Sequence, residues 1–416
     1  MKLEVVTIGT ELLLGYTLDS NGADLGRELA AVGVEVVRRT SVADRPDAIR
    51  AALQEALDRT GVVITTGGLG PTRDDVTKAV AAEIFDRPLV LDPALLKALE
   101  ARFVRLGRTP MPPLNRTQAE VPQGASVLPN AHGTAPGLWL EDGERLAILL
   151  PGVPRELRGL LVEEVLPRLR SRAATSGLTP SVVRSRTVRT TGIAESALAE
   201  RVAPLAEGLG PLTLAFLPSV AGVDLRLTAW ELPATDADDL LANAARRLAE
   251  AAGEHYYGLD DIDLAAVVLD LLRRDGHRLG VAESCTGGLV GGRLTAVPGA
   301  SDTFLGGVVA YADAVKTAML DVPAVVLAEH GAVSEPTVRA MAEGVQRRLR
   351  VDCAVAVTGI AGPGGGSPQK PVGTVWLAAR VAGETRTLCR MFPGDRDEIR
   401  RRAAQAALDL LRRVLV

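Results

Sequence analysis

The sequence predicts an α/β protein with three parts: an N-terminal doubly wound parallel sheet, a small α+β middle domain and a C-terminal α/β domain. Its 416 residues exceed what one hydrophobic core normally holds. Short apolar runs alternate with amphipathic stretches in the first part, which is typical of parallel strands joined by crossover helices. In the last part, two apolar strands each run into a glycine-rich loop. We therefore expect domains over residues 1–170, 171–255 and 263–416.

Hydrophobic periodicity and helix-ending glycines place the individual elements. In the first domain we expect strands at Leu3–Ile8, Val34–Arg38, Val62–Thr66 and Leu146–Leu150. Helices are expected at Asn21–Gly33 and Asp47–Thr60, from about Thr72, and after the last strand through Leu169. In the middle domain we expect strands at Arg184–Thr190 and Val223–Trp230, and helices at Ala194–Leu205 and near Asp236–Ala252. In the last domain we expect helices at Leu264–Arg274 and Asp397–Leu415, and strands at Arg278–Ala282, Cys353–Thr358 and Thr374–Val381.

Composition narrows the class of protein. Hydrophobic residues make up 47% of the chain and charged residues 24%, which is the balance of a soluble globular protein. No apolar run approaches the ~20 residues that cross a bilayer, and the N-terminus lacks the pattern of a signal peptide, so we expect a cytoplasmic protein. The net charge of −4 gives no electrostatic support for nucleic-acid binding. The three cysteines show neither metal-ligand nor disulfide spacing.

A glycine loop follows the third strand of the first domain, at Thr65–Asp75. Glycines let main-chain N–H groups approach a ligand, and a helix N-terminus favours anions. Thr72 is expected to cap the following helix, while Asp74 and Asp75 either serve its first turn or hold a Mg²⁺-type divalent metal. A tight strand–helix turn without a ligand is the alternative. The candidate residues of this N-terminal nucleotide site are Glu11, Gly67, Gly68, Gly70, Thr72, Asp74 and Asp75.

The last domain carries a candidate nucleophile, Ser284, in a turn between a strand and a helix. Backbone amides at Thr286–Gly288 are expected to stabilise an oxyanion there. No histidine stands in a comparable motif, so Lys316 is the expected base, because a buried lysine can accept a hydroxyl proton. Tyr311 lies five residues before it and is placed to relay a proton or orient the pair. A helix cap at Ser284 and a nucleophilic Cys285 are the alternatives.

A second glycine loop, Thr358–Gly366, leaves the apolar strand that begins at Cys353. Such a loop suits a phosphate or a ribose, with Thr358 as a hydroxyl donor. Arg396 could supply a guanidinium to the phosphate, or be a surface residue in a turn. The candidate substrate-binding residues of this domain are Thr286, Gly287, Gly288, Thr358, Gly359, Gly362 and Arg396.

These motifs together resemble the competence/damage-inducible protein CinA family over the full length of the chain. The C-terminal region is similar to the nicotinamide-nucleotide amidohydrolases through Ala282–Gly288, Val297–Gly307, Tyr311–Lys316, Gly331–Ser334, Thr358–Pro363 and Lys370–Val375. The resemblance implies a C-terminal α/β amidase domain that deamidates nicotinamide mononucleotide (NMN) without a cofactor. It places the catalytic roles on Ser284, Lys316 and Tyr311. The family usually has Ser-Asn where this chain has Ala312-Asp313, a difference expected to touch neither Ser284 nor Lys316.

The N-terminal region is similar to molybdopterin-binding-type domains through the loop Thr66–Asp75 and the strings Gly9–Gly15, Gly133–Gly137 and Leu150–Glu156. This resemblance implies an ADP-ribose pyrophosphatase that depends on a divalent metal near Asp74 and Asp75. The middle module suggests a homodimer. The alternative to an enzyme is a non-catalytic nucleotide- or pterin-binding adaptor in competence or recombination.

Overall fold

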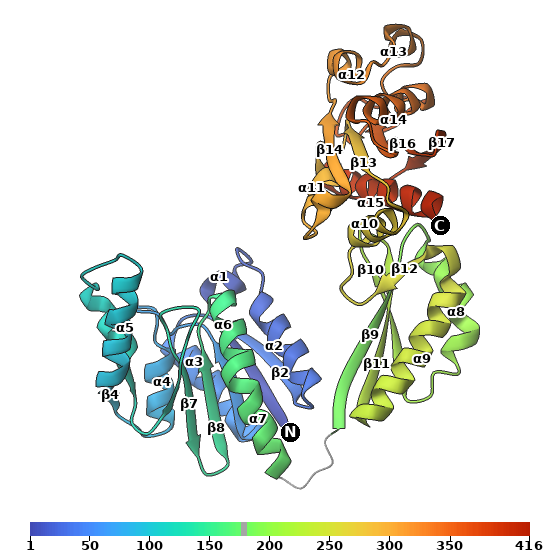
Figure 1. Cartoon of the computed structure of the whole chain (residues 1–416). Helices are drawn as coiled ribbons and strands as arrows, with labels where there is room; N and C mark the ends of the chain where they lie inside the picture. The colour runs from blue at the N-terminus through green and yellow to red at the C-terminus, as the bar shows by residue number, and fades with distance from the viewer. Residues whose placement is uncertain (176–180) are drawn as a thin grey trace. The chain divides into compact units, whose positions relative to one another are not determined.

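The computed structural model describes residues 1–175 and 181–416 (Figure 1). The chain divides into two compact units, which are described separately. The first comprises Met1–Arg184 with Ala229–Asp238, and the second comprises Ser185–Thr228 with Asp239–Val416.

The first unit is built around a six-stranded sheet of order β2-β1-β3-β8-β7-β6. Its strands are β1 (Lys2–Ile8), β2 (Glu35–Val42), β3 (Val62–Thr66), β6 (Ser126–Leu128), β7 (Gly137–Asp142) and β8 (Arg145–Leu150). Strands β2, β1, β3 and β8 are mutually parallel, as the sequence predicts. Strands β7 and β6 extend the sheet in antiparallel fashion and were not predicted.

Helices cover both faces of this sheet (Figure 1). One face packs against α2 (Ser20–Ala31), α6 (Pro154–Leu160) and α7 (Leu166–Thr175), and the other against α3 (Pro46–Thr60) and α4 (Thr77–Ile84). Alternate residues of one strand enter the two cores: Val5 lies in the first and Val6 in the second. The strands are therefore apolar on both faces, and the doubly wound class is confirmed.

The expected start of the helix after the glycine loop is wrong. Helix α4 begins at Thr77, and the residue before it, Val76, makes no side-chain cap. Thr72 therefore does not cap this helix; it belongs to a turn between the loop and α4. The later part of the domain holds β4 (Leu89–Leu91), α5 (Pro93–Arg105), the 3₁₀ helix η1 (Pro113–Ala119) and β5 (Glu120–Pro122).

The middle region of the chain forms a four-stranded sheet of order β10-β11-β9-β12. Its elements are β9 (Ser181–Thr190), α8 (Glu195–Ala206), β10 (Leu212–Pro218), β11 (Val223–Pro233), α9 (Ala234–Ala252) and β12 (Tyr256–Leu259). The predicted strands and helices match β9, β11, α8 and α9, whereas β10 and β12 were missed. Strand β12 has only four residues and gives a weak periodic signal, whereas β10 has seven residues, as many as β1, and its length does not explain the omission.

The C-terminal domain has a five-stranded sheet of order β14-β13-β15-β16-β17. Its strands are β13 (Leu279–Glu283), β14 (Phe304–Val309), β15 (Cys353–Gly359), β16 (Thr374–Val381) and β17 (Glu384–Met391). One face packs on α10 (Leu264–Asp275), α11 (Leu289–Thr295) and α15 (Arg396–Leu415). The other packs on α12 (Asp313–Leu320) and α14 (Glu335–Leu349). Because β13, β14 and β15 are parallel, their carboxyl ends meet at one edge of the sheet.

Candidate functional site

Ser284 lies directly after β13, at the carboxyl edge of the C-terminal sheet. Its backbone N–H donates to the carbonyl of Val357 in the neighbouring strand at 2.9 Å, which fixes the start of the turn. The Ser284 side chain is nearly buried, with 7% of the residue exposed. The sheet thus holds this hydroxyl in a defined position, which a reacting group requires.

Glu283 organises the same turn, although the sequence interpretation did not single it out. Its buried carboxylate accepts hydrogen bonds from the backbone amides of Gly288, Val290 and Gly291, at 2.8–3.1 Å. These are the free amides at the start of α11, so the acid caps that helix from the preceding strand. The sequence does contain a signal for this role of Glu283, because an acidic residue stands at the end of an apolar strand and just before a glycine-rich helix start.

Lys316 lies in the second turn of α12 and is almost completely buried, at 1% exposure. Its Nζ donates to the backbone carbonyl of Tyr311 at 3.0 Å and to Oδ1 of Asp313 at 3.2 Å. The expectation that Asp313 would not touch Lys316 is therefore wrong. Three residues along a helix bring two side chains onto the same face, which explains the contact.

Ser284 and Lys316 line one cavity of about 160 Å³. Six of the predicted site residues lie around it: Ser284, Tyr311, Lys316, Thr358, Gly359 and Arg396. Arg396 Nη2 donates to the Tyr311 hydroxyl oxygen at 2.9 Å, and its other amino group donates to the carbonyl of Gly362. The Thr358 hydroxyl donates to the carbonyl of Ala332 at 2.8 Å.

Four other described residues of the predicted site, Thr286, Gly287, Gly288 and Gly362, lie outside the lining of this cavity. The amide of Gly287 donates to the Ser284 carbonyl at 3.1 Å, and that of Gly288 donates to Glu283. Two of the three amides expected to hold an oxyanion are therefore already engaged.

Arg400 was also missed by the sequence interpretation. Its guanidinium reaches from α15 and donates to the carbonyls of Cys285 and Thr286 at 3.2 and 3.0 Å. The Arg400 side chain therefore links the turn after Ser284 to α15. Its spacing, one turn after Arg396, places both arginines on the same face of α15.

Cys285 also lines the cavity, so its position alone does not exclude it as the nucleophile. Burial, however, raises the pKa of its thiol to about 12. The thiolate is the reactive form of cysteine, and its fraction near neutral pH is then very small. Burial therefore works against a preformed thiolate at Cys285, and a role for this residue would need a base, as a role for Ser284 does.

The N-terminal glycine loop has a different structure from the one expected. Both oxygens of Asp75 turn back onto the loop, accepting from the amides of Gly70 and Thr72 at 2.7 and 2.8 Å. Gly67 has a φ of 108°, and a Cβ there would lie 2.2 Å from the carbonyl of Ile8. The loop is therefore shaped by backbone contacts with β1 and by Asp75.

The paired aspartates do not fit a shared metal site in this conformation, because Asp75 would have to release two backbone amides. Among the described residues, no group of three or more histidine, cysteine, aspartate or glutamate side chains is arranged to hold a metal ion. Glu11 lies in the first turn of the short helix α1 (Thr10–Leu13) and is exposed. A divalent metal at this loop stays a prediction from the family resemblance.

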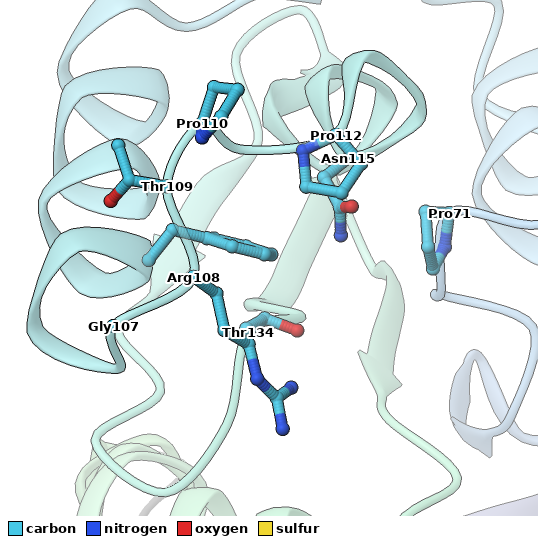
Figure 2. Close-up of a pocket in the computed structure, with 9 residues that line it drawn as sticks. Pro71, Gly107, Arg108, Thr109, Pro110, Pro112, Asn115 and Thr134 are labelled. Carbon is cyan, nitrogen blue, oxygen red and sulfur yellow. The ribbon is translucent and has the colours of Figure 1, made fainter.

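A cavity of about 590 Å³ lies beside the glycine loop, at Pro71. Figure 2 shows the Asn115 and Thr134 side chains pointing into the space between Pro71 and the segment 107–112. Arg108 lines the same cavity and is its charged residue. Thr134 lies in the string Gly133–Gly137, which carries the family resemblance, but none of these three residues was among the predicted site residues, because only the fold brings their separate segments together.

The fold defines a multidomain α/β protein, and Ser284 and Lys316 line one cavity in its last domain. Family models match all three regions: a probable molybdopterin binding domain at residues 4–171, a damage-inducible protein CinA KH domain at 185–258 and a CinA C-terminal domain at 261–415. A CinA-like protein from Gemmatimonas aurantiaca is 56% identical over 415 residues, covering 99% of this chain and 96% of that protein. The chain therefore belongs to the CinA family.

Two further relatives show the extent of the similarity. A putative competence-damage inducible protein from Symbiobacterium thermophilum is 46% identical over 428 residues, covering 100% of this chain and 99% of that protein. A solved structure of a CinA superfamily protein from Klebsiella pneumoniae is 38% identical, with a TM-score of 0.36, and covers 36% of this chain and 95% of that chain.

In the described parts of the chain, no helix is both long enough and apolar enough to span a membrane.

Proposed function

We propose that the C-terminal domain hydrolyses the amide of nicotinamide mononucleotide, releasing ammonia and nicotinic acid mononucleotide. The observation that carries the proposal is the joint presence of Ser284 and the buried Lys316 in one cavity. A serine hydroxyl needs an adjacent base to become a nucleophile, and a desolvated lysine is one of the few side chains that can serve. The family resemblance supplies the substrate.

In the proposed reaction, neutral Lys316 accepts the proton of Ser284 and the serine oxygen attacks the carboxamide carbon. The tetrahedral intermediate collapses, the C–N bond breaks, and ammonia leaves with a proton returned from the Lys316 ammonium. Water then hydrolyses the acyl-serine ester, which regenerates the hydroxyl and releases the carboxylic acid. Each proton that Lys316 accepts is returned within the cycle.

Tyr311 and Arg396 assist in this proposal. Arg396 donates to the Tyr311 oxygen, so the hydroxyl keeps its own hydrogen to donate to the substrate. Because the Gly287 and Gly288 amides are engaged elsewhere, this O–H is a suitable donor to the developing oxyanion or to the leaving nitrogen. Thr358 and Gly359 also line the cavity, and we expect the ring and carboxamide of the substrate to lie against them.

The test is ammonia release from NMN by the purified full chain and by Lys316→Ala. Loss of the base is expected to lower kcat at least ~100-fold, whereas Lys97→Ala, an exposed lysine of the first unit, should behave as wild type. Folding is checked by thermal melting of each variant. A folded wild-type protein that releases no ammonia would sink the proposal, and salt-dependent DNA binding by that protein would favour the adaptor alternative.

We further propose that the N-terminal cavity binds ADP-ribose and that water hydrolyses its pyrophosphate there to give AMP and ribose 5-phosphate. Its volume of about 590 Å³ is in the range of small-molecule sites, and Arg108 offers a guanidinium to a phosphate. Calorimetric titration with ADP-ribose should show binding that Arg108→Ala weakens about tenfold or more. The exposed Arg38→Ala, on β2 and outside both the glycine loop and the lining of this cavity, is the charge-matched control. Equal affinity in Arg108→Ala and wild type would contradict this assignment.

A further inference from the structure

The contacts of Lys316 carry an inference that rests on the proposed amidase function and deepens it. A neutral lysine amine has two N–H donors and one lone pair, arranged tetrahedrally. The carbonyl of Tyr311 and Oδ1 of Asp313 each accept from Nζ. With both hydrogens of the neutral amine held by these acceptors, the lone pair occupies the remaining direction. A serine proton would have to be accepted by that lone pair, and Ser284 lines the same cavity as Lys316.

We propose that Asp313 is a positioning residue for the base Lys316: it fixes one N–H of the amine and, by its charge, sets the pH at which the base becomes active. The carboxylate is part of the cavity lining, although its side chain is 59% exposed. Asp313 is also an acidic residue in the first turn of α12, where a carboxylate stabilises a helix whatever its other contacts. The experiment must therefore separate positioning from helix stability.

The other groups that face Lys316 do not replace Asp313 in this role. Cys285 is kept protonated by burial, and Tyr311 and the cationic Arg396 are bonded to each other. On the side of α14, the buried Val338 and Met341 pack in one hydrophobic core with Leu320 of α12. Asp313 is thus the anion that the cavity presents to the amine.

The sign of the charge effect follows directly. A carboxylate beside the amine stabilises the protonated ammonium, which is inactive as a base. Removing the charge but keeping the oxygen, as in Asp313→Asn, should move the acid limb of the kcat/KM profile to lower pH. Because the carboxylate is exposed and screened, the movement should be below about one pH unit. High salt should produce part of the same movement in wild type and little in the variant.

Removal of the oxygen tests positioning. Asp313→Ala leaves one N–H of the amine without its acceptor, and kcat should fall about 10- to 100-fold with little change in KM. Asp313→Asn should retain kcat within about threefold at the plateau of its own pH profile, because the amide oxygen still accepts. Loss of a helix-start charge alone would affect the two variants alike and leave the pH profile in place.

The matched control is Asp321→Asn, at the other end of α12. Asp321 caps the same helix in a left-handed conformation that asparagine tolerates, and it pairs with Arg347 and Arg348 rather than Lys316. The control changes net charge equally and should leave the acid limb where it is. An acid limb that does not move in Asp313→Asn, or that moves as in the control, would overturn the proposal, as would full kcat in Asp313→Ala.

A second readout does not depend on amidase activity. The chain has only five lysines, Lys2, Lys78, Lys97, Lys316 and Lys370, so the ε-carbon signals of ¹³C-lysine-labelled protein can be assigned by single substitutions. The midpoint of the Lys316 signal should be lower in Asp313→Asn than in wild type. If wild type releases no ammonia, the proposed function fails, and this titration still decides the Asp313 proposal. An equal midpoint in both proteins would refute it.

Discussion

At the scale of single residues, two neighbours compete for the role of nucleophile. Ser284 and Cys285 both line the C-terminal cavity, and cysteine is intrinsically the better nucleophile. Burial nevertheless raises the pKa of the Cys285 thiol to about 12, and Arg400 binds the Cys285 carbonyl rather than its sulfur. A serine hydroxyl is not ionised beforehand either, so both candidates depend on a base during the reaction, and only variants can separate them.

The residue-scale prediction separates these two candidates. Ser284→Ala should abolish ammonia release from NMN while substrate binding survives, because the hydroxyl forms the covalent intermediate. Cys285→Ala should retain turnover within about tenfold, the loss coming from a small cavity left under the turn. Steady-state ammonia assays and calorimetric binding measure the two effects. Near-normal turnover in Ser284→Ala together with its loss in Cys285→Ala would reverse the assignment.

At the scale of elements, the site depends on how closely α14 and α12 approach. Gly344 lies in the buried face of α14, and a Cβ there would come within 1.9 Å of the carbonyl of Leu320, at the end of α12. The absence of a side chain at Gly344 therefore lets the helix that carries Lys316 pack tightly. Gly292 in α11 is also helical, but a Cβ at that position has open space around it.

These two glycines give the element-scale prediction. Gly344→Ala should lower the free energy of unfolding by about 1–3 kcal/mol, because α12 and α14 must move apart. Gly292→Ala should be neutral or stabilising by up to about 1 kcal/mol, since alanine is the better helix former. Urea denaturation measures both. If both variants are equally stable, the close approach of the two helices is not tight enough to matter.

At the scale of the whole molecule, polar contacts join the middle region to the C-terminal domain within the second unit. Asp409 in α15 accepts from Arg412 and Arg413 at 2.7–3.0 Å, and all but about a tenth of the Asp409 and Arg412 side chains is buried. Arg412 donates onward to the carbonyl of Glu254, and Gln405 donates to the Thr191 hydroxyl at 3.2 Å. One helix thus reaches from the cavity residue Arg396 to the middle sheet.

The whole-molecule prediction concerns this buried ion pair. Asp409→Ala leaves the Arg412 guanidinium without its carboxylate and should cost about 3–5 kcal/mol in the second unit. Scanning calorimetry should show that the transition of the second unit falls while that of the first unit stays in place. An equal shift of all transitions would mean that the two units unfold together. A homodimer, also expected from the sequence, stays a prediction that analytical ultracentrifugation can check.

Local periodicity and residue type were enough to predict the α/β class, the parallel strands and the motifs that carry chemistry. The sequence placed Ser284 after an apolar strand and singled out Lys316 as the base, because no histidine stands in a comparable motif. Each of these features consists of residues that are contiguous in the sequence, so they can be recognised without knowledge of long-range contacts.

Only the tertiary structure decided which motifs meet. The fold brings Thr358 and Arg396 to the cavity that Ser284 lines. It directs the Gly287 and Gly288 amides to other acceptors and places Asp313 within hydrogen-bond distance of Lys316. It also turned Asp75 back onto its own loop and assembled a second cavity from distant segments. Hydrogen-bond partners and burial depend on contacts across the sheet and between helices, and sequence spacing does not record them.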